Sequence, residues 1–466
     1  MSEVSSPVPA SFRDPSGFVF RRDGRLYRQV NRSAQEDYDL LISSGLYDRL
    51  VERGLLIPHQ EVDIEAADPA LAYRIIEPEP LPFLSWPFEW SFSHLKDAAL
   101  ATLAIQKTAI EHGMVLKDAS AYNMQFHRGR QVMIDTLSFE RYHEGRPWQA
   151  YRQFCQHFLA PLALMARRDI RLGQLLRVHI DGIPLDLASK LLPRSTRLRP
   201  GLAMHLHLHA RFQARHADTR GAGDGERKAG ARVSRTGLLG LIDGLKNTIS
   251  KLDWNPGGTE WADYYNDTNY SDSAFGQKRA IVTEFIETLA PAALWDLGAN
   301  NGEFTRLATA MDIPAVAFDI DPSAVEANYR RVRQERAGGP LPLVMDLSNP
   351  SPGLGWDERE RESLIQRGPV DCVMALALIH HLAISNNVPL GRIAAFLARI
   401  ARAVIIEWVP KSDSQVQRLL RSREDIFDRY HQDGFEDAVR QHFEIVERRQ
   451  VAQSERWLYL LRSRAG

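Results

Sequence analysis

The chain has 466 residues, enough for two or three domains, and its composition of 44% hydrophobic and 25% charged residues is typical of a folded protein. The net charge of −1 argues against a general polyanion-binding surface, so nucleic acid is not an expected partner. The two cysteines, Cys155 and Cys372, allow no disulfide framework or zinc site, and no segment has the apolar length of a membrane span or an export signal. We therefore expect a soluble cytoplasmic protein with no metal site and no membrane partner.

The N-terminal half predicts a small domain of mixed strands and helices. Residues 1–16 are rich in Ser and Pro and are expected to be disordered. In residues 17–210, Asp23-Gly24 predicts a hairpin turn, and the apolar periodicity of residues 95–111 predicts a helix. Two short apolar runs, residues 123–126 and 132–134, flank a Gly-Arg turn and predict a second hairpin.

Two acidic residues and an asparagine, Asp118, Asn123 and Asp135, follow the helix predicted at residues 95–111. Asn123 lies five residues after Asp118, and Asp135 lies twelve residues after Asn123. The pattern resembles the catalytic loop and metal-binding acid of protein kinases and aminoglycoside phosphotransferases. That resemblance implies that the first Asp orients an acceptor hydroxyl, while the Asn and second Asp hold magnesium.

The departures from the kinase pattern predict a domain without phosphoryl transfer. No glycine-rich phosphate loop is present, and the first lysine of the chain is Lys96, beyond the strands that would carry the phosphate-binding lysine. Arg28 is a poor geometric substitute for that lysine. Phosphoryl transfer depends mainly on positioned charge, so these losses should remove most of the rate. We expect residues 17–210 to be kinase-like in fold and catalytically inactive.

A change in composition marks a domain boundary. Large apolar residues nearly vanish in residues 211–235, where Gly, Ala and mixed charges predict a linker rather than a nucleic-acid contact. The following residues 254–278 hold several polar aromatic side chains ahead of a predicted helix at residues 279–289. Tyr270 and Lys278 are candidates for a lid over a ligand, with ordinary packing or solvent exposure as the alternative.

The most informative motif begins at Ala293. An apolar run ends at Asp296, and a glycine turn from Gly298 to Gly302 leads into an amphipathic stretch, a pattern that predicts strand, tight loop and helix. A second apolar run ends at Asp319, 21 residues after Gly298. This spacing is that of a nucleotide-binding βαβ unit whose second strand delivers a carboxylate to a ribose diol. A cofactor that contains ribose is indicated.

The loop favours a cofactor without phosphate. Asn300 and Glu303 stand where a dinucleotide fingerprint has glycines, and a carboxylate at a helix N-terminus repels phosphate. The acidic side chains of Asp296 and Glu303 suit the ammonium and sulfonium of S-adenosylmethionine. The motif resembles motif I of class I S-adenosylmethionine-dependent methyltransferases. The resemblance implies a cofactor site with these residues: Asp296, Gly298, Asn300, Gly302, Asp319 and Asp346.

Later segments follow the strand order of that family and predict an α/β, Rossmann-like sheet over roughly residues 260–466. Strands are expected to end at Asp346, at His380 and His381, and at Glu407, followed by two antiparallel strands at residues 443–451 and 457–461. Asp346 either contacts the adenine amino group or only caps its own turn. Because ligands bind at the carboxyl ends of strands in open α/β sheets, we predict His380, His381 and Glu407 as catalytic residues, with a histidine as the base for a hydroxyl acceptor.

Both halves together resemble a bacterial family of two-part methyltransferases related to the rhizobial host-specific nodulation protein. The resemblance rests on Ser85-Trp-Pro-Phe-Glu-Trp, Leu116-Lys-Asp-Ala-Ser and Trp295-Asp-Leu-Gly-Ala-Asn-Asn-Gly, and implies a methyltransferase domain at residues 236–466. The absence of an Asn/Asp-Pro-Pro-Tyr sequence after the fourth strand favours O-methylation of a small molecule or glycan. A bifunctional kinase-like methyltransferase and a non-catalytic binding protein are the alternatives.

Overall fold

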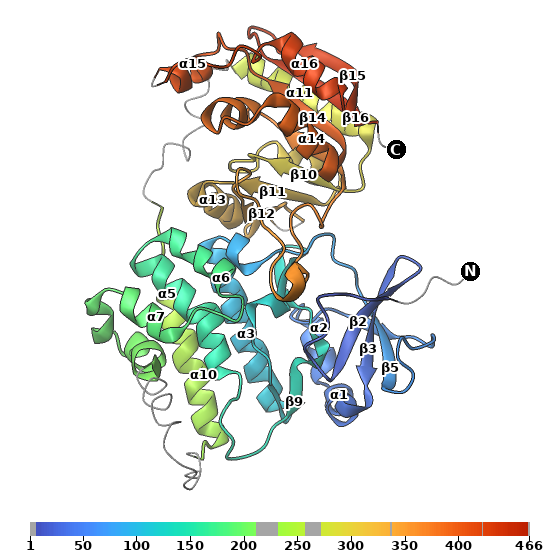
Figure 1. Ribbon diagram of the computed structural model, residues 1–466. Helices are drawn as coiled ribbons and strands as arrows, with labels where there is room; N and C mark the ends of the chain where they lie inside the picture. The colour runs from blue at the N-terminus through green and yellow to red at the C-terminus, as the bar shows by residue number, and fades with distance from the viewer. Residues whose placement is uncertain (1–5, 211–231, 257–271, 336–337, 422, 465–466) are drawn as a thin grey trace. The chain divides into compact units, whose positions relative to one another are not determined.

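The computed structural model describes residues 6–210, 232–256, 272–335, 338–421 and 423–464 (Figure 1). The chain divides into two compact units. Unit 1 comprises Met1–Asn255 and Leu354–Arg361, and unit 2 comprises Pro256–Gly353 and Glu362–Gly466. In the described part of the chain, no helix combines the length and apolar character that a membrane span requires.

Unit 1 begins with a five-stranded antiparallel sheet in the order β1-β2-β3-β5-β4. The strands are β1 (Ser6–Pro7), β2 (Gly17–Arg22), β3 (Arg25–Asn31), β4 (His59–Glu61) and β5 (Ala72–Pro78), with helices α1 (Gln35–Ser43) and α2 (Leu46–Glu52) between β3 and β4. The β2–β3 hairpin turns at Asp23 and Gly24, which both have positive φ. This confirms the turn predicted from the Asp-Gly pair, because such a hairpin turn needs left-handed residues.

The prediction of disorder over residues 1–16 is wrong for the described residues 6–16. Strand β1 pairs with β2, and the Val8 N–H donates to the carbonyl of Val19 at 2.8 Å. Backbone pairing with an edge strand orders this segment, and such pairing leaves little trace in a Ser- and Pro-rich composition. Residues 1–5 lie outside the described part of the chain.

The rest of unit 1 is mainly helical and is arranged around α3 (Phe92–Glu111), the helix predicted from periodicity. It contains two short β-pairs, β6 (Met114–Leu116) with β9 (Phe139–Arg141) and β7 (Met124–His127) with β8 (Arg130–Met133), and the β7–β8 hairpin confirms the second predicted hairpin. The other helices are α4 (Tyr151–Phe154), α5 (Ala160–Arg167), α6 (Leu175–Val178), α7 (Leu185–Leu191), α8 (Pro200–Leu202) and α10 (Arg235–Ser250).

Two segments that the sequence assigned to the methyltransferase domain lie in unit 1. Helix α10 buries an apolar stripe, Leu238, Ile242, Leu245 and Ile249, and it contacts α3. Residues 354–361, which lie between β12 and β13 in sequence, pack through the buried Glu360, whose carboxylate pairs with Arg13 at 2.6 Å. The predicted start at residue 236 is therefore wrong, because tertiary packing rather than composition decides where these segments belong. Residues 211–231 of the expected linker lie outside the described residues.

Unit 2 is built on a seven-stranded sheet in the order β12-β11-β10-β13-β14-β16-β15. The strands are β10 (Leu294–Leu297), β11 (Ala315–Asp319), β12 (Leu341–Val344), β13 (Val370–Ala375), β14 (Ala401–Trp408), β15 (Phe443–Gln450) and β16 (Trp457–Ser463). The first five are parallel, and β16 is antiparallel to both β14 and β15. All seven predicted strands are present. Strand β16 is antiparallel as expected, whereas β15, which is antiparallel to β16, runs in the same direction as the five parallel strands. Strand β13 ends at Ala375 and not at the predicted His380 and His381, because the chain turns at the left-handed Ala377.

Helices cover both faces of this sheet (Figure 1). They are α11 (Asp272–Leu289), α12 (Thr305–Thr309), α13 (Pro322–Val332), α14 (Leu390–Ile400), α15 (Ser414–Leu420) and α16 (Gln432–Arg440). Helix α12 leads from β10 toward one sheet edge and α14 leads from β13 toward the other, so right-handed crossovers place them on opposite faces. From β10, successive strands are added first toward one edge of the sheet and then, from β13, toward the other edge. An open α/β sheet forms its ligand crevice at such a switch point.

Candidate functional site

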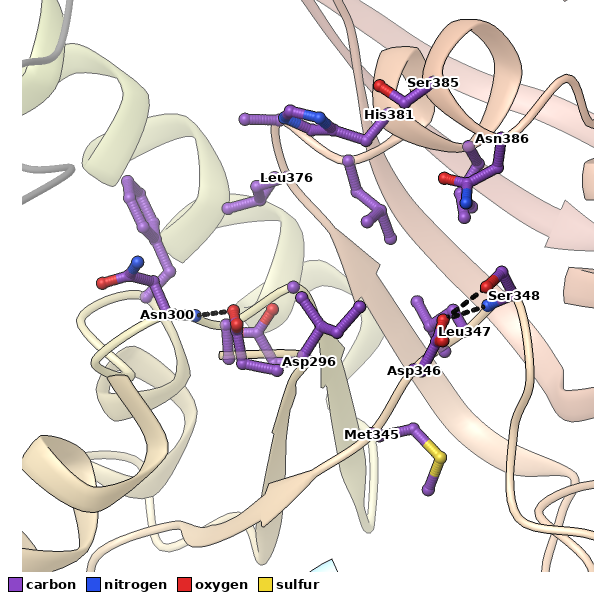
Figure 2. Close-up of a pocket in the computed structure, with 18 of the residues that line it drawn as sticks. Asp296, Asn300, Met345, Asp346, Leu347, Ser348, Leu376, His381, Ser385 and Asn386 are labelled. Carbon is purple, nitrogen blue, oxygen red and sulfur yellow. Dashed lines mark hydrogen bonds between the residues drawn. The ribbon is translucent and has the colours of Figure 1, made fainter. Parts of the chain in front are cut away.

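A cavity of about 350 Å³ lies in unit 2 at the carboxyl ends of the parallel strands (Figure 2). Its lining comes mainly from the first two turns of α11, the loops after β10, β11, β12 and β13, and the π-helical turn η11 (His381–Ser385). Asp296, Gly298, Asn300, Asp319, Asp346 and His381 all line it. The residues that the sequence assigned to one site are thus largely brought together, although they come from separate segments of the chain.

The glycine turn after β10 shapes one wall of the cavity. Gly298 and Gly302 both have a φ of 77°, and Asn300 has a φ of 51°. A side chain at Gly302 would meet the Asn328 amide at 2.4 Å, so glycine is required there both for the backbone conformation and for space. Gly302 does not itself line the cavity. It allows the turn to close, while Gly298 lines the cavity directly.

Asp319 ends β11 with its carboxylate turned into the loop. It accepts the backbone N–H of Asn300 at 2.7 Å and the backbone N–H of Asp321 at 2.8 Å. Burial raises the pKa of Asp319 to about 6, against the lowering effect of these backbone hydrogen bonds. The carboxylate therefore has its orientation fixed by neutral donors.

Asp296 lies inside β10, one strand away from Asp319, and accepts a hydrogen bond from the Thr305 hydroxyl at 2.6 Å. Burial, aided by the nearby charge of Asp319, raises the pKa of Asp296 to about 7. Two buried carboxylates in one cavity repel each other, and a cationic ligand relieves that repulsion. The cavity is thus suited to a ligand that carries positive charge.

Glu303 does not share this role, although the sequence suggested that its charge would face the cofactor. Its carboxylate pairs with Arg279 and with Arg331, the latter at 3.2 Å, and the residue does not line the cavity. The cationic partners neutralise it. Of the two acids that favoured a cationic cofactor, Asp296 remains at the cavity.

The loop after β12 forms another part of the wall, where Met345, Asp346, Leu347 and Ser348 line the cavity. Figure 2 shows the Asp346 carboxylate bonded to Ser348, whose N–H and hydroxyl donate at 2.8 and 2.6 Å. Asp346 thus caps its own turn and also faces the cavity, so the two alternatives raised from the sequence are compatible. Ile320, which is 61% exposed, adds an apolar surface beside Asp319.

The three predicted catalytic residues lie in different settings. His381 lines the cavity from η11, and burial together with the charge of Arg456 lowers its pKa to about 4. His380 is fully buried, does not line the cavity, and has no hydrogen-bond partner among the described residues for either ring nitrogen. Burial holds the pKa of His380 well below its usual value. The side chain of Glu407 is also fully buried, and its carboxylate accepts hydrogen bonds from Lys278 and from the Ala377 backbone.

Residues beyond those predicted complete the lining. Phe275, Phe304, Leu376, Ala377 and Leu378 supply apolar surface, and Ser385 and Asn386 supply polar groups near His381. Ala377 is left-handed, with a φ of 49°, which turns the chain sharply after β13. Short apolar runs carry no signal that distinguishes a cavity wall from a core, so the sequence could not single these residues out. The lid candidate Tyr270 lies outside the described residues, whereas Lys278 lines the cavity.

Unit 1 also brings its predicted residues together. Asp118 accepts the N–H of Ser120 at 2.8 Å, and the charge of Asp135 acts on it across the cluster. Burial is the main reason that the pKa of Asp118 is raised. Asp135 is paired with Arg28 at 2.7 Å, and the Asn123 amide donates to the Ser138 hydroxyl at 3.1 Å. The acids and the amide of this cluster are thus largely satisfied by protein groups.

Comparison with known proteins gives the family. No protein-family model matches the chain. The chain is 35% identical over 461 residues to the nodulation protein NoeA of Rhizobium meliloti (strain 1021), and the match covers 97% of this chain and 95% of NoeA. The chain belongs to the NoeA family. This confirms the resemblance to the nodulation protein family that the sequence motifs indicated.

Among the solved structures that are similar over part of the chain are WbdD and ChlM. WbdD, a bifunctional kinase-methyltransferase, is 16% identical, with 43% of this chain and 41% of WbdD covered at a TM-score of 0.31. The match therefore spans less than half of WbdD. Magnesium protoporphyrin IX methyltransferase (ChlM) from Synechocystis PCC 6803, solved with bound SAH, is 17% identical, with 44% of this chain and 93% of ChlM covered at a TM-score of 0.31.

These TM-scores are low, and the assignment of unit 2 rests on its own features. The order of its seven strands, the glycine turn after β10 and the carboxylate at the end of β11 are those of the class I methyltransferases that the sequence resembles. The buried carboxylates fit the cationic groups and ribose diol of S-adenosylmethionine. Unit 2 is a class I S-adenosylmethionine-dependent methyltransferase domain, and S-adenosylmethionine is its cofactor.

Proposed function

We propose that the protein transfers a methyl group from S-adenosylmethionine to a hydroxyl oxygen of a glycan or small molecule. The observation that carries the proposal is that His381 lines the same cavity as Asp296 and Asp319, the two carboxylates that we assign to the cofactor. The lack of the Asn/Asp-Pro-Pro-Tyr sequence after β13 supports oxygen rather than an amide or adenine nitrogen as the acceptor.

The polar groups of the cavity support a residue-by-residue assignment of the cofactor. Asp319 would accept hydrogen bonds from the two ribose hydroxyls, Asp346 would accept from the adenine amino group, and Asp296 would face the methionine ammonium. Gly298 and Asn300 would contact the cofactor through the turn, while Gly302 would act by allowing that turn. When bound, S-adenosylmethionine supplies an electrophilic methyl group on its sulfonium.

His381 is the base that we propose for the acceptor hydroxyl. Its pKa is lowered to about 4, which keeps the imidazole neutral at physiological pH and also makes it a weaker base than an ordinary histidine. His380 is a poor candidate because it is enclosed in the core, and Glu407 is a poor candidate because Lys278 and the Ala377 N–H already occupy its carboxylate. We therefore assign His380 and Glu407 supporting roles rather than a direct part in proton transfer.

We also propose that unit 1 is a kinase-like domain that has lost phosphoryl transfer and binds or positions the acceptor. The antiparallel sheet followed by a mainly helical part, and the cluster of Asp118, Asn123 and Asp135, support the kinase-like assignment. The Arg28 guanidinium supports inactivity, because it pairs with Asp135, the acid that would otherwise hold magnesium. A bifunctional enzyme remains the alternative, and ATP turnover by the full chain distinguishes the two.

The acceptor can be identified by incubating the full-length protein with cell extract and isotopically methyl-labelled S-adenosylmethionine, followed by mass spectrometry. We expect a labelled glycan or small molecule whose methyl group is on oxygen. The His381→Ala variant should label that product at least about 100-fold more slowly, whereas the exposed-surface variant Arg359→Ala should label it at the wild-type rate. Label on nitrogen, or no difference between His381→Ala and wild type, would overturn the proposal.

A further inference from the structure

Lys278 is a buried cation at the wall of the cavity. It lies in α11 and is 4% exposed, and its ammonium is 2.6 Å from the Glu407 carboxylate and 4.9 Å from the centre of the Phe304 ring. Because a buried ion pair seldom stabilises a protein more than apolar residues of similar size, a pair in this position calls for a further reason.

Glu407 fixes where the Lys278 ammonium sits. The oxygen that binds Lys278 also accepts the Ala377 N–H at 2.8 Å, and the other oxygen lies 3.5 Å from Arg456. Arg456 is in turn bonded to Asp413 at 2.8 Å. Glu407 is therefore anchored on two sides, and the ammonium is held beside the cavity rather than free to swing away.

The charged groups that line the cavity can be compared with the charged groups of the cofactor. The acids among the described lining residues are Asp296, Asp319 and Asp346, and Lys278 is the one lysine or arginine in that set. S-adenosylmethionine carries two cationic centres and one anion, the α-carboxylate of its methionine part. Asp296 and Lys278 line the same cavity, so it offers a carboxylate and an ammonium to the two charged groups of an amino-acid zwitterion.

We propose that Lys278 binds the α-carboxylate of S-adenosylmethionine, and that Glu407 is a positioning residue that holds Lys278 for this contact. The inference deepens the proposed function by adding a cofactor contact, and it does not depend on which acceptor is methylated. The Phe304 ring contributes by facing the same ammonium. Glu407 thereby gains a role in cofactor binding in place of the catalytic role expected from the sequence.

The test compares S-adenosylmethionine with its decarboxylated analogue, which differs only by the carboxylate, in calorimetric titrations of the full chain. We expect wild type to prefer S-adenosylmethionine, and Lys278→Met to weaken its binding by about 10- to 100-fold, the scale of a lost charge-assisted hydrogen bond. The same variant should change binding of the decarboxylated analogue by less than about threefold. Equal weakening of both ligands, or no weakening of either, would overturn the inference.

Two further variants keep the test interpretable. Lys278→Met leaves Glu407 buried with one partner fewer, so the double variant Lys278→Met/Glu407→Gln removes both charges and should show the same loss of preference for the carboxylate. Arg279→Met is the matched control, because Arg279 is the next residue of α11 and pairs with Glu303 instead of lining the cavity. It should keep the wild-type preference. Failure of wild type to bind either ligand would refute the cofactor assignment and this inference together. If the cofactor binds but no methylated product is found, only the proposed reaction is refuted.

Discussion

The two units each gather acids that are distant in sequence, and they differ in what holds those acids. In unit 2, Asp319 is oriented by backbone N–H groups and Asp296 by a hydroxyl, so the negative charge is kept for a ligand. In unit 1, Asp118 is likewise held by a backbone N–H, but the charge of Asp135 is paired with Arg28. Acids held by neutral donors form a binding site for a cation, whereas an acid paired with arginine mainly ties the fold together.

The largest expected effect concerns the ion pair that supports the unit 2 cavity. Glu407→Ala leaves the buried Lys278 ammonium without its counterion, so the free energy of unfolding should fall by about 3–5 kcal/mol. Urea unfolding followed by tryptophan fluorescence measures this loss. The Lys278→Met/Glu407→Leu double variant, in which no charge is stranded, should lie much closer to wild type. A stability for Glu407→Ala equal to that of wild type would show that solvent reaches Lys278.

The next effect is on chemistry. His381→Ala should lower kcat by about 100-fold or more, the usual scale for loss of a general base, while cofactor affinity stays nearly unchanged. Turnover and a separate cofactor titration measure the two quantities. His380→Ala is an informative comparison, because His380 is buried and does not line the cavity, so its loss should lower stability more than it lowers proton transfer. Wild-type turnover in the His381→Ala variant would show that His381 is not the general base.

The pH dependence of cofactor binding sharpens the contrast between the units. The pKa of Asp319 is raised to about 6 and that of Asp296 to about 7, so in the ligand-free protein both carboxyls keep a proton above the usual range. Their contribution to folding stability is present below about pH 4 and is lost as pH rises through about 6 to 7.

Cofactor binding has the opposite dependence, because ribose hydroxyls donate to the ionised carboxylate and cations favour it. Affinity should rise by up to about tenfold per pH unit for each carboxyl that must ionise, level off above about pH 8, and be accompanied by proton release. Titrations in two buffers of different ionisation enthalpy measure that release. Asp319→Asn should reduce the pH dependence, and affinity that falls as pH rises would contradict the account.

The smallest expected effect is in unit 1. Asp118→Asn should leave both methyl transfer and the low background of ATP hydrolysis unchanged, because we expect no phosphoryl transfer to depend on this cluster. A coupled assay for ADP measures the second quantity. Robust ATP turnover in wild type that Asp118→Asn abolishes would break the comparison and favour a bifunctional enzyme.

The sequence predicted the sheet of unit 2 well because its signals are local. Glycines in a tight turn and acids at strand ends leave marks at fixed spacing, so the amino-acid sequence alone was enough to assign Asp296, Gly298 and Asp319 to one site. Parallel strands buried on both faces also appear as apolar runs. Most strand ends were predicted to within two residues for the same reason, but β13 ends at Ala375, well before the predicted His380 and His381.

The remaining features depend on long-range packing. The Lys278–Glu407 pair joins residues 129 positions apart, and no spacing rule connects a helix lysine to a strand-end acid. His380 is buried, whereas its neighbour His381 lines the cavity. The two residues lie at an irregular turn, so the periodicity of the sequence cannot predict which of them faces the cavity. The neutralisation of Glu303 by Arg279 and Arg331, and the placement of α10 in unit 1, likewise arise from contacts between separate elements.

The central claim is that the carboxylate at the end of β11, and not its counterpart in unit 1, binds the cofactor. Calorimetric titration of S-adenosylmethionine into wild type, Asp319→Ala and the matched variant Asp135→Ala tests it most directly. The account predicts binding to wild type that Asp319→Ala weakens by about 1.5–3 kcal/mol, the scale of a charge-assisted hydrogen bond, and that Asp135→Ala leaves unchanged. Equal affinity of Asp319→Ala and wild type would contradict it.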